Sequence, residues 1–545
     1  MLSKTDLMRW AKSRDVQAAF AYLAIATGLA APGLASHVFW SDEAMTAQHA
    51  HNFLIFGRFP GFDGTNVFAY HGGIDLTEKL EQFVGPYLQF YVTAASFALF
   101  GESTLTGRLP FLVIGLLSLV ALHRWMKVQM GPGFPAWLPS LLLSCNVSFL
   151  LFTRNCRYYA LVFLFFPLVF WAWAALRDSR RPWLTVALGA AAAAGLFAAH
   201  SMAGLASAVL LAMLLVLRRH RTRVHLTFVV VVACIVGIGA VSVLLAGDPT
   251  QLGGPSRGGI PLWENAITLM RWQIEALGSF EFVPLAVMPI LALPFLLAKL
   301  KDQRPLALEG ALAVAAVIVV LAVVAVVSPQ PTRGPNTQPI PIMRYGLQVL
   351  TVGAIAAACV IVIVQRWLGQ IAAVALAAVV MLTNVTYLGA TAWRSTVWEL
   401  VYEYMHWNPS GSDALVAYAQ TLPDGTLIKI QPHNMTPQVQ YYVPNLRYVA
   451  MLDRFKTIDP AVRATLPEYV FAGSVAPEIV MVGLDSTRLP NRLDIEGRLY
   501  TLKDVIKTYN ADLTRPELIT HEFRRNPAND ERHVIAVFQL AGGNP

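Results

Sequence analysis

Charged residues are scarce in this chain of 545 amino acids. Asp, Glu, Lys and Arg make up 14% of it, whereas hydrophobic residues make up 56%, and the mean hydropathy is +0.52. A soluble globular protein carries about 25% charged residues. The scarcity of charge therefore excludes an ordinary soluble protein and predicts a chain that crosses a membrane several times.

Cysteine is also rare, and the motifs of several enzyme classes are missing. The four cysteines lie in or beside apolar segments, and residues 395–545 contain none, so this region has no internal disulfide bond. The sequence has no P-loop, no HExxH or CxxC motif, and no GxGxxG after an expected strand. These absences give no support to a nucleotide hydrolase, a zinc protease or a dinucleotide-binding enzyme.

The net charge of +8 is unevenly distributed along the chain. Residues 1–394 hold 27 Lys and Arg against 16 Asp and Glu, whereas residues 395–545 hold 14 against 17. The excess of basic residues lies in short loops between apolar segments, where orientation signals of membrane proteins occur. No basic stripe is interleaved with aromatic residues, so nucleic acid is not an expected partner.

Apolar segments define the expected crossings of the membrane. They are residues 17–40, 86–100, 104–122, 134–152, 157–176, 183–199, 201–217, 226–246, 282–298, 307–327, 343–364 and 370–391. All basic loops between them are cytoplasmic if residues 86–100 form an interfacial helix, which gives eleven crossings with the N-terminus inside. The alternative, in which 86–100 also crosses, stays open, so we expect about 11 to 13 transmembrane helices. The first segment is too long for a signal-peptide core and is expected to be an uncleaved helix.

Residues 395–545 have the composition of a soluble domain. Short apolar runs at 427–430, 478–482 and 533–538 predict three buried strands. Polar residues before Ala414 predict the start of a helix there, and Pro423-Asp-Gly425 predicts a turn.

These predictions divide the chain into two domains. Residues 1–394 are expected to form an α-helical polytopic membrane domain, with residues 41–103 as its first outer loop. Residues 395–545 are expected to form a soluble α/β domain on the extracytoplasmic side. We therefore expect a multi-pass protein of the cell inner (plasma) membrane.

Two adjacent carboxylates, Asp42 and Glu43, lie where the first apolar segment ends. Carboxylates at a membrane–water boundary carry a desolvation cost and are often functional. Neighbouring side chains point in different directions, so one is suited to act as a base and the other to hold a hydroxyl or a basic partner. The alternative is a solvated pair in a loop.

Basic residues gather at the predicted outer ends of the helices. Arg154 and Arg157 lie between two apolar segments, where guanidinium groups favour an anion such as a lipid phosphate. His200 marks a tight outer turn, Arg344 begins a further helix, and Lys79 precedes the interfacial segment. The alternatives are arginines that bind ordinary phospholipid headgroups and a structural histidine.

The order of these motifs resembles that of one known family. The motifs are Ser41-Asp42-Glu43-Ala44, Gly101-Glu-Ser with Arg108-Leu-Pro110, Arg154-Asn-Cys-Arg157-Tyr158-Tyr159-Ala-Leu161, His200 and Arg344-Tyr345, over about residues 1–390. The chain resembles the GT-C superfamily of multi-pass glycosyltransferases that use polyprenyl-phosphate sugars. Within it, the likeness is to the protein O-mannosyltransferase and lipid A aminoarabinose transferase branch. The chain differs from the aminoarabinose transferases at Val84-Gly85-Pro86, where a Lys-Pro-Pro-like sequence is common.

The resemblance implies a role for each candidate residue. Asp42 is implied as the catalytic base, and Glu43 matches the second acid of the motif, which orients the acceptor. Binding of the donor phosphate is implied for Arg157, Arg344, Arg154, Lys79 and His200, and substrate contact is expected for Tyr158, Tyr345 and Arg58. No cofactor or metal is required by this chemistry, although the acidic first loop leaves weak binding of a divalent metal open.

The resemblance implies an inverting glycosyltransferase that moves a sugar from a polyprenyl-phosphate donor to an acceptor hydroxyl on the outer face of the membrane. Its expected partners are the lipid-linked sugar, an acceptor glycolipid, glycan or protein, and membrane lipids. Two alternatives stay open, a lipid-linked glycan transporter and a polymerase or ligase that uses diphosphate-linked glycans. A transporter is disfavoured because helix interiors such as 183–199 and 311–327 lack the polar groups of a translocation path.

Overall fold

The computed structural model describes most of the chain and groups it into two compact units. The described residues are 14–68, 76–82, 87–217, 222–245, 260–279, 289–328, 345–382, 411–431, 435–450, 452, 458–471, 473–507 and 533–541. The first unit comprises residues 1–32 and 111–405, and the second comprises residues 33–110 and 406–545. This division differs from the predicted single boundary at 394/395, because it assigns residues 33–110 to the unit of the C-terminal residues.

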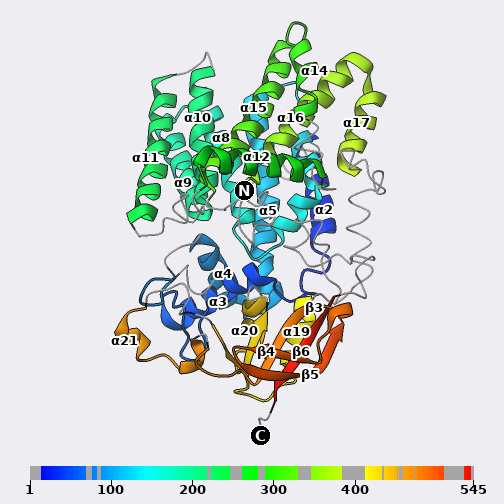
Figure 1. Ribbon diagram of the computed structural model, residues 1–545. Coiled ribbons are helices and arrows are strands. Elements are labelled where there is room, and N and C mark those ends of the chain that lie inside the picture. Colours follow the sequence, from blue (N-terminus) through cyan, green and yellow to red (C-terminus); the bar gives the residue numbers. More distant parts are fainter. Residues whose placement is uncertain are drawn as a thin grey trace, which may run out of the picture. The chain divides into compact units, whose positions relative to one another are not determined.

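The described part of the first unit is a bundle of helices (Figure 1). Its helices are α2 (Arg14–Ala30), most of α5 (Thr104–Met130), α6 (Leu138–Ser144), α7 (Val147–Thr153), α8 (Tyr159–Ala175), α9 (Pro182–Ala199), α10 (Ser201–Leu217), α11 (Arg223–Leu245), α12 (Leu262–Ser279), α14 (Leu293–Ala298), α15 (Arg304–Val327), α16 (Gln348–Leu368) and α17 (Gln370–Leu382). α9 packs against α8, α10 and α11, and α15 packs against α16. α16 is the most buried of the long apolar helices because it also contacts α6 and α8.

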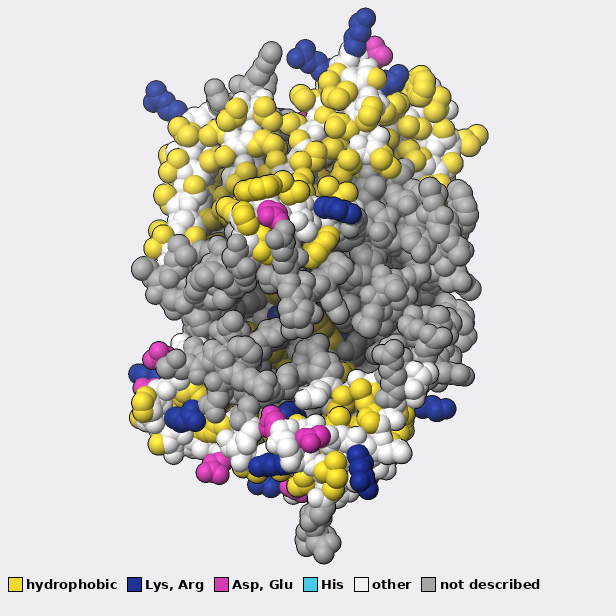
Figure 2. Space-filling view, viewed as in Figure 1, with side chains coloured by type: hydrophobic (Ala, Val, Ile, Leu, Met, Phe, Trp, Pro, Cys, Tyr) yellow, Lys and Arg dark blue, Asp and Glu magenta, His cyan; other side chains and the backbone are white. Residues whose placement is uncertain are grey.

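Within the described residues, five helices are long and apolar enough to cross a membrane, namely α5, α9, α11, α15 and α16. Shorter apolar helices are α8, α10, α17 and, in the second unit, α4 (Tyr87–Phe100). Figure 2 shows that the visible surface of the first unit's helices is mostly apolar, with most of its Lys and Arg side chains along the upper edge. Large apolar side chains such as Ile238 and Ile371 are exposed, as lipid contact requires. The expected helical membrane domain is confirmed, and the number of crossings stays a prediction.

The first predicted segment, 17–40, is not one helix. α2 ends at Ala30, and the chain from there to Trp40 forms turns and irregular structure. Pro32 lacks the N–H that a continuing helix needs, and Gly33 has a φ of 62°. The acidic pair therefore lies in a separate element that follows this break.

Two further segments differ from the prediction. Residues 134–152 form two short helices, α6 and α7, because the Asn146 side chain caps α7 by accepting a hydrogen bond from the Phe149 N–H at 2.9 Å. Between the predicted apolar segments 226–246 and 282–298, the described residues contain α12. This amphipathic helix packs against α15 and runs across the other helices of its unit in Figure 1.

Glycines allow helices of the first unit to approach one another closely. A Cβ atom at Gly239 of α11 would lie 2.3 Å from Cε1 of Phe197 on α9. A Cβ atom at Gly115 of α5 would lie 2.5 Å from Cβ of Thr153 on α7. Small residues at such contacts are typical of helix packing in membranes.

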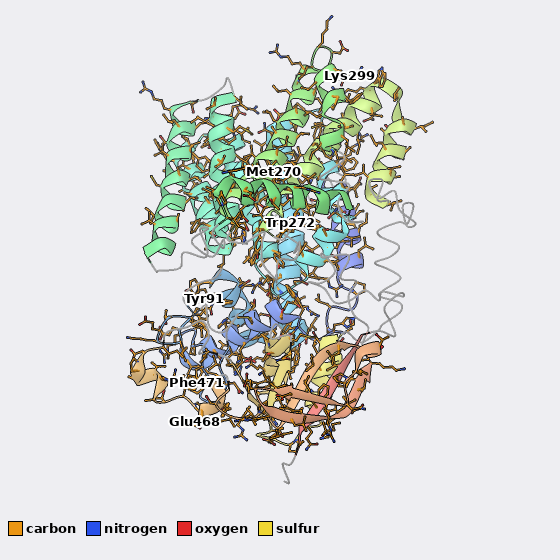
Figure 3. The ribbon with its side chains drawn as sticks, viewed as in Figure 1. Tyr91, Met270, Trp272, Lys299, Glu468 and Phe471 are labelled. Carbon is orange, nitrogen blue, oxygen red and sulfur yellow. The ribbon has the colours of Figure 1, made fainter. Side chains whose placement is uncertain are left out.

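Lys299 lies in the turn between α14 and α15 (Figure 3). Its Nζ atom is 4.4 Å from the ring centroid of Trp367 near the end of α16, a cation–π contact. This turn is one of the basic loops predicted to be cytoplasmic.

The second unit contains a mixed six-stranded sheet. Its order is β2 (Arg447–Tyr448), β1 (Leu427–Gln431), β3 (Ile479–Asp485), β6 (His533–Leu540), β5 (Arg498–Lys507) and β4 (Arg492–Ile495). β2, β1 and β3 are parallel, and the remaining pairs are antiparallel. The three predicted strands correspond to β1, β3 and β6, which are neighbours in the sheet and carry its core, including Ile428, Met481 and Val537.

The helices of this unit are α3 (Ser41–Phe56), α4, α19 (Gly411–Ala419), α20 (Thr436–Tyr442) and α21 (Pro460–Arg463), with short 3₁₀ turns at Glu468–Val470 and Ser486–Arg488. α19 begins at Gly411, three residues before the predicted start. The expected turn at Pro423–Gly425 is present, since Gly425 has a φ of 76° and the Thr426 N–H donates to the Pro423 oxygen at 3.2 Å. β4 and β5 were not predicted because charged and polar residues interrupt their apolar residues, most of which are partly exposed.

First-loop residues complete the hydrogen bonding of the sheet's edge. The Asn66 side chain accepts from the Tyr448 N–H at 3.0 Å and donates to the Leu446 oxygen at 2.9 Å. The Gln440 amide donates to the Val67 oxygen at 3.0 Å. Buried polar groups need such partners, so residues 33–110 and the C-terminal residues form one unit.

Two glycines of α11 provide a matched test of the helix packing. Gly239→Ala should lower the free energy of unfolding by about 1–3 kcal/mol, because its Cβ atom would overlap Phe197. Gly237→Ala, two residues away and facing open space, should leave stability unchanged or raise it by up to about 1 kcal/mol. Thermal unfolding of both purified variants in detergent measures the difference, and equal effects would contradict the packing.

Candidate functional site

Asp42 and Glu43 lie in the first turn of α3. The N-terminus of a helix favours negative charge, so both carboxylates suit this position electrostatically. The Glu43 side chain also accepts a hydrogen bond from the N–H of Trp40, the residue before the helix, at 3.3 Å. This hydrogen bond satisfies a backbone N–H at the start of α3.

Arg108 holds Glu43 from the start of α5. Its Nε and Nη2 atoms donate to the two carboxylate oxygens of Glu43 at 2.9 and 2.7 Å. Its remaining N–H groups donate to the backbone oxygens of Leu34, His37 and Val38, each at 3.0 Å. All five N–H donors of the guanidinium group are therefore used.

The ion pair is buried. Glu43 is 0% exposed and Arg108 is 4% exposed, and the guanidinium carbon lies 5.4 Å from the ring centroid of Phe39. Bidentate geometry and full hydrogen bonding offset the desolvation of both charges. Glu43 is thus an anchor of the acidic motif, and its neighbour Asp42, 7% exposed, is held with it on α3.

The other first-loop candidates have different surroundings. Arg58 is exposed and forms an ion pair with Glu81, and Lys79 is exposed in a turn. His51 of α3 lies 2.9 Å from Glu102, and this hydrogen bond raises the pKa of the imidazole above its ordinary value. Both side chains of that pair are more than a third exposed, so the pair contributes little stability.

A stack of three rings brings together candidates from separate parts of the first unit. Tyr158, at the start of α8, lies 4.7 Å from His200, which ends α9, with 14° between the ring planes. His200 in turn lies 5.8 Å from Tyr345, which precedes α16, again at 14°. The stack therefore joins three positions that sequence reasoning singled out separately.

Two arginines flank this stack in the sequence. The guanidinium carbon of Arg157 lies 5.6 Å from the ring centroid of Tyr158, a cation–π contact, and Arg157 is partly exposed. Arg154, which ends α7, is 2% exposed and is among the largest fully enclosed side chains. Arg344 lies outside the described residues. His200 accepts a hydrogen bond at Nδ1 from the Ala203 N–H at 3.3 Å, which leaves Nε2 as the protonated nitrogen of the neutral ring.

The ring stack and its arginine combine group types that suit an anionic ligand. A guanidinium group, an imidazole N–H and two phenol hydroxyls supply hydrogen-bond donors, and the aromatic faces supply an apolar surface beside them. Within the described part of the chain, no group of three or more His, Cys, Asp and Glu side chains is placed to hold a metal ion.

Several residues that bind the acidic motif were not among the predicted site residues. Arg108 belongs to one of the motifs, but no function was predicted for it. A guanidinium group in an apolar sequence, the signal that marked Arg157, also indicates a buried partner for Arg108. Asp413 and Tyr442 bind the segment that leads to α3, and the sequence gives no signal of this contact because they lie about 370 to 400 positions away from it.

Comparisons with known proteins agree with this fold. Residues 84–244 match the family model described as dolichyl-phosphate-mannose-protein mannosyltransferase. ArnT from Cupriavidus metallidurans bound to undecaprenyl phosphate has a similar structure, with 15% identity and a TM-score of 0.50, covering 96% of this chain and 99% of that one. The Archaeoglobus fulgidus oligosaccharyltransferase in the apo form gives 10% identity and a TM-score of 0.47, covering 83% of this chain and 65% of that one. No curated protein sequence matches the chain. The resemblance to the GT-C glycosyltransferases is confirmed.

The buried ion pair can be tested with two glutamate substitutions. Glu43→Gln leaves the Arg108 charge buried without its counter-charge, and should lower the free energy of unfolding by about 3–5 kcal/mol. Glu102→Gln, the same change at an exposed pair, should cost about 1 kcal/mol or less. Thermal unfolding in detergent compares the two, and similar losses would contradict the anchoring role of Glu43.

Proposed function

We propose that this protein is an inverting glycosyltransferase that moves a sugar from a polyprenyl-phosphate donor to an acceptor hydroxyl on the outer face of the membrane. The observation that carries the proposal is the Glu43–Arg108 pair, which fixes the first turn of α3 and with it Asp42. Immobilising one acid of the motif by a buried guanidinium group leaves the adjacent acid as the candidate base. Deprotonation of an acceptor hydroxyl as it attacks calls for a base positioned in this way.

Asp42 acts as the general base in this proposal. It takes the proton of the acceptor hydroxyl as that oxygen attacks the anomeric carbon of the donor sugar. The bond to the lipid phosphate breaks on the opposite side, so the configuration at the anomeric carbon inverts. A phosphate leaving group carries its own negative charge, and cationic donors stabilise it.

Arg157 and His200 bind the donor phosphate in this proposal, with Arg154, Arg344 and Lys79 as further cations. The stack of Tyr158, His200 and Tyr345 fixes the orientation of the imidazole ring. The similar structure of ArnT was solved with undecaprenyl phosphate, which supports a lipid phosphate as the ligand class. Arg58 and the two tyrosines contact substrate.

The first test removes the base. Asp42→Asn should lower kcat for transfer from a polyprenyl-phosphate sugar by about 10²- to 10⁴-fold, because the amide cannot accept the proton. Glu468→Gln, an exposed carboxylate of the same unit (Figure 3), is the matched control and should transfer sugar at the wild-type rate. Release of lipid phosphate by purified protein measures both, and full activity of Asp42→Asn would remove Asp42 from this role.

The second test concerns the donor phosphate. Arg157→Gln should raise the KM for the lipid-linked donor by about 10- to 100-fold, because a charge-assisted hydrogen bond to phosphate is lost. Arg177→Gln changes an exposed arginine of the same unit, paired with Asp178, and should leave KM within about twofold of wild type. An unchanged KM for Arg157→Gln would contradict phosphate binding there.

A further inference from the structure

The segment that leads into α3 has no regular secondary structure, and its backbone is bound from two directions. Arg108 donates hydrogen bonds to the backbone oxygens of His37 and Val38. The C-terminal residues accept hydrogen bonds from the N–H groups of the same segment, since Val38 donates to Oδ1 of Asp413 at 2.9 Å and Phe39 donates to the hydroxyl of Tyr442 at 2.9 Å. The segment ends at Trp40, two residues before Asp42.

Tyr442, at the end of α20, has a buried hydroxyl with two partners. It accepts from Phe39 and lies 2.7 Å from the hydroxyl of Thr104 at the start of α5. Burial raises the pKa of Tyr442 to about 12, so the phenol is neutral at physiological pH and can donate to Thr104 while it accepts from Phe39. Its ring also lies 6.0 Å from that of Phe39. α20 itself packs against α3.

Asp413, in the first turn of α19, binds the same segment through both carboxylate oxygens. Oδ2 lies 2.7 Å from Nδ1 of His37, and Oδ1 accepts the Val38 N–H. Both side chains of the Asp413–His37 pair are mostly buried. Asp413 therefore lies at the predicted start of a helix and also binds the segment that leads into α3.

We infer that Asp413 and Tyr442 of the C-terminal residues are positioning residues for the catalytic base, acting through the backbone of residues 37–39. The C-terminal sheet region is then part of the catalytic apparatus rather than an accessory domain. This inference rests on the proposed function of Asp42. It predicts that loss of the Tyr442 hydroxyl loosens the start of α3 and lowers the rate of chemistry more than the binding of the donor.

Tyr448 offers a matched control in the same unit. Its hydroxyl is buried and donates to the Val443 oxygen at 2.7 Å, and its ring lies in the core of the sheet. Tyr448→Phe therefore removes one buried hydroxyl, as Tyr442→Phe does, but the Tyr448 hydroxyl binds the Val443 oxygen and not the backbone of residues 37–39. A purely structural effect would appear in both variants.

The experiment measures kcat, the KM for the lipid-linked donor and the thermal unfolding temperature of the full-length protein in detergent. Tyr442→Phe should lower kcat by about 10-fold, with KM within twofold of wild type, because catalysis is sensitive to small displacements of the base. Tyr448→Phe should lower only the unfolding temperature. Asp413→Ala should reduce kcat like Tyr442→Phe, and Asp413→Asn, which keeps an acceptor for the Val38 N–H, should restore part of it. Equal kcat values for Tyr442→Phe and Tyr448→Phe would overturn the inference.

Hydrogen–deuterium exchange separates failure of this inference from failure of the proposed function. Backbone amides of residues 37–44 should exchange faster in Tyr442→Phe than in wild type or Tyr448→Phe. A wild-type protein that transfers no sugar would refute the glycosyltransferase proposal, while faster exchange would still support the role of Tyr442 in holding this segment. Unchanged exchange in Tyr442→Phe would overturn that role whatever the activity.

Discussion

The buried ion pair between Arg108 and Glu43 is the interaction on which the acidic motif depends. A guanidinium group buried without a partner would be strongly unfavourable, and this one satisfies each N–H by binding Glu43 and three backbone oxygens. The same contacts tie the irregular segment after α2 to the start of α3 and to the start of α5. This arrangement also fixes the backbone position of Asp42, because Asp42 directly precedes Glu43 in the first turn of α3.

The C-terminal residues hold the same segment as Arg108. Asp413 and Tyr442 accept hydrogen bonds from its N–H groups, whereas Arg108 donates to its backbone oxygens. Asn66 forms a hydrogen bond with the edge strand of the sheet. The first loop and the C-terminal region therefore share one set of hydrogen bonds, although more than 300 residues separate them in the chain. The helices of the first unit pack closely against one another at glycines. Their exposed faces carry apolar side chains, which suit contact with lipid.

Much of the fold could be predicted from local patterns. The long apolar helices follow from composition and length, and the three central strands follow from short apolar runs. The errors occur where a single residue overrides the pattern. Pro32 and Gly33 follow the early end of α2, and Asn146 divides an apolar segment into α6 and α7. Hydropathy averages over such residues and cannot detect them.

The sequence by itself determined the helical membrane character, the C-terminal α/β region and the identity of the acidic and basic candidates, because these depend on residue type and local order. Only the tertiary structure decided that Tyr158, His200 and Tyr345 stack, and that Glu43 is an anchor held by Arg108. Those relations depend on contacts between residues far apart in the chain. A residue's type states which bonds it can make, and the fold decides which partner comes within reach.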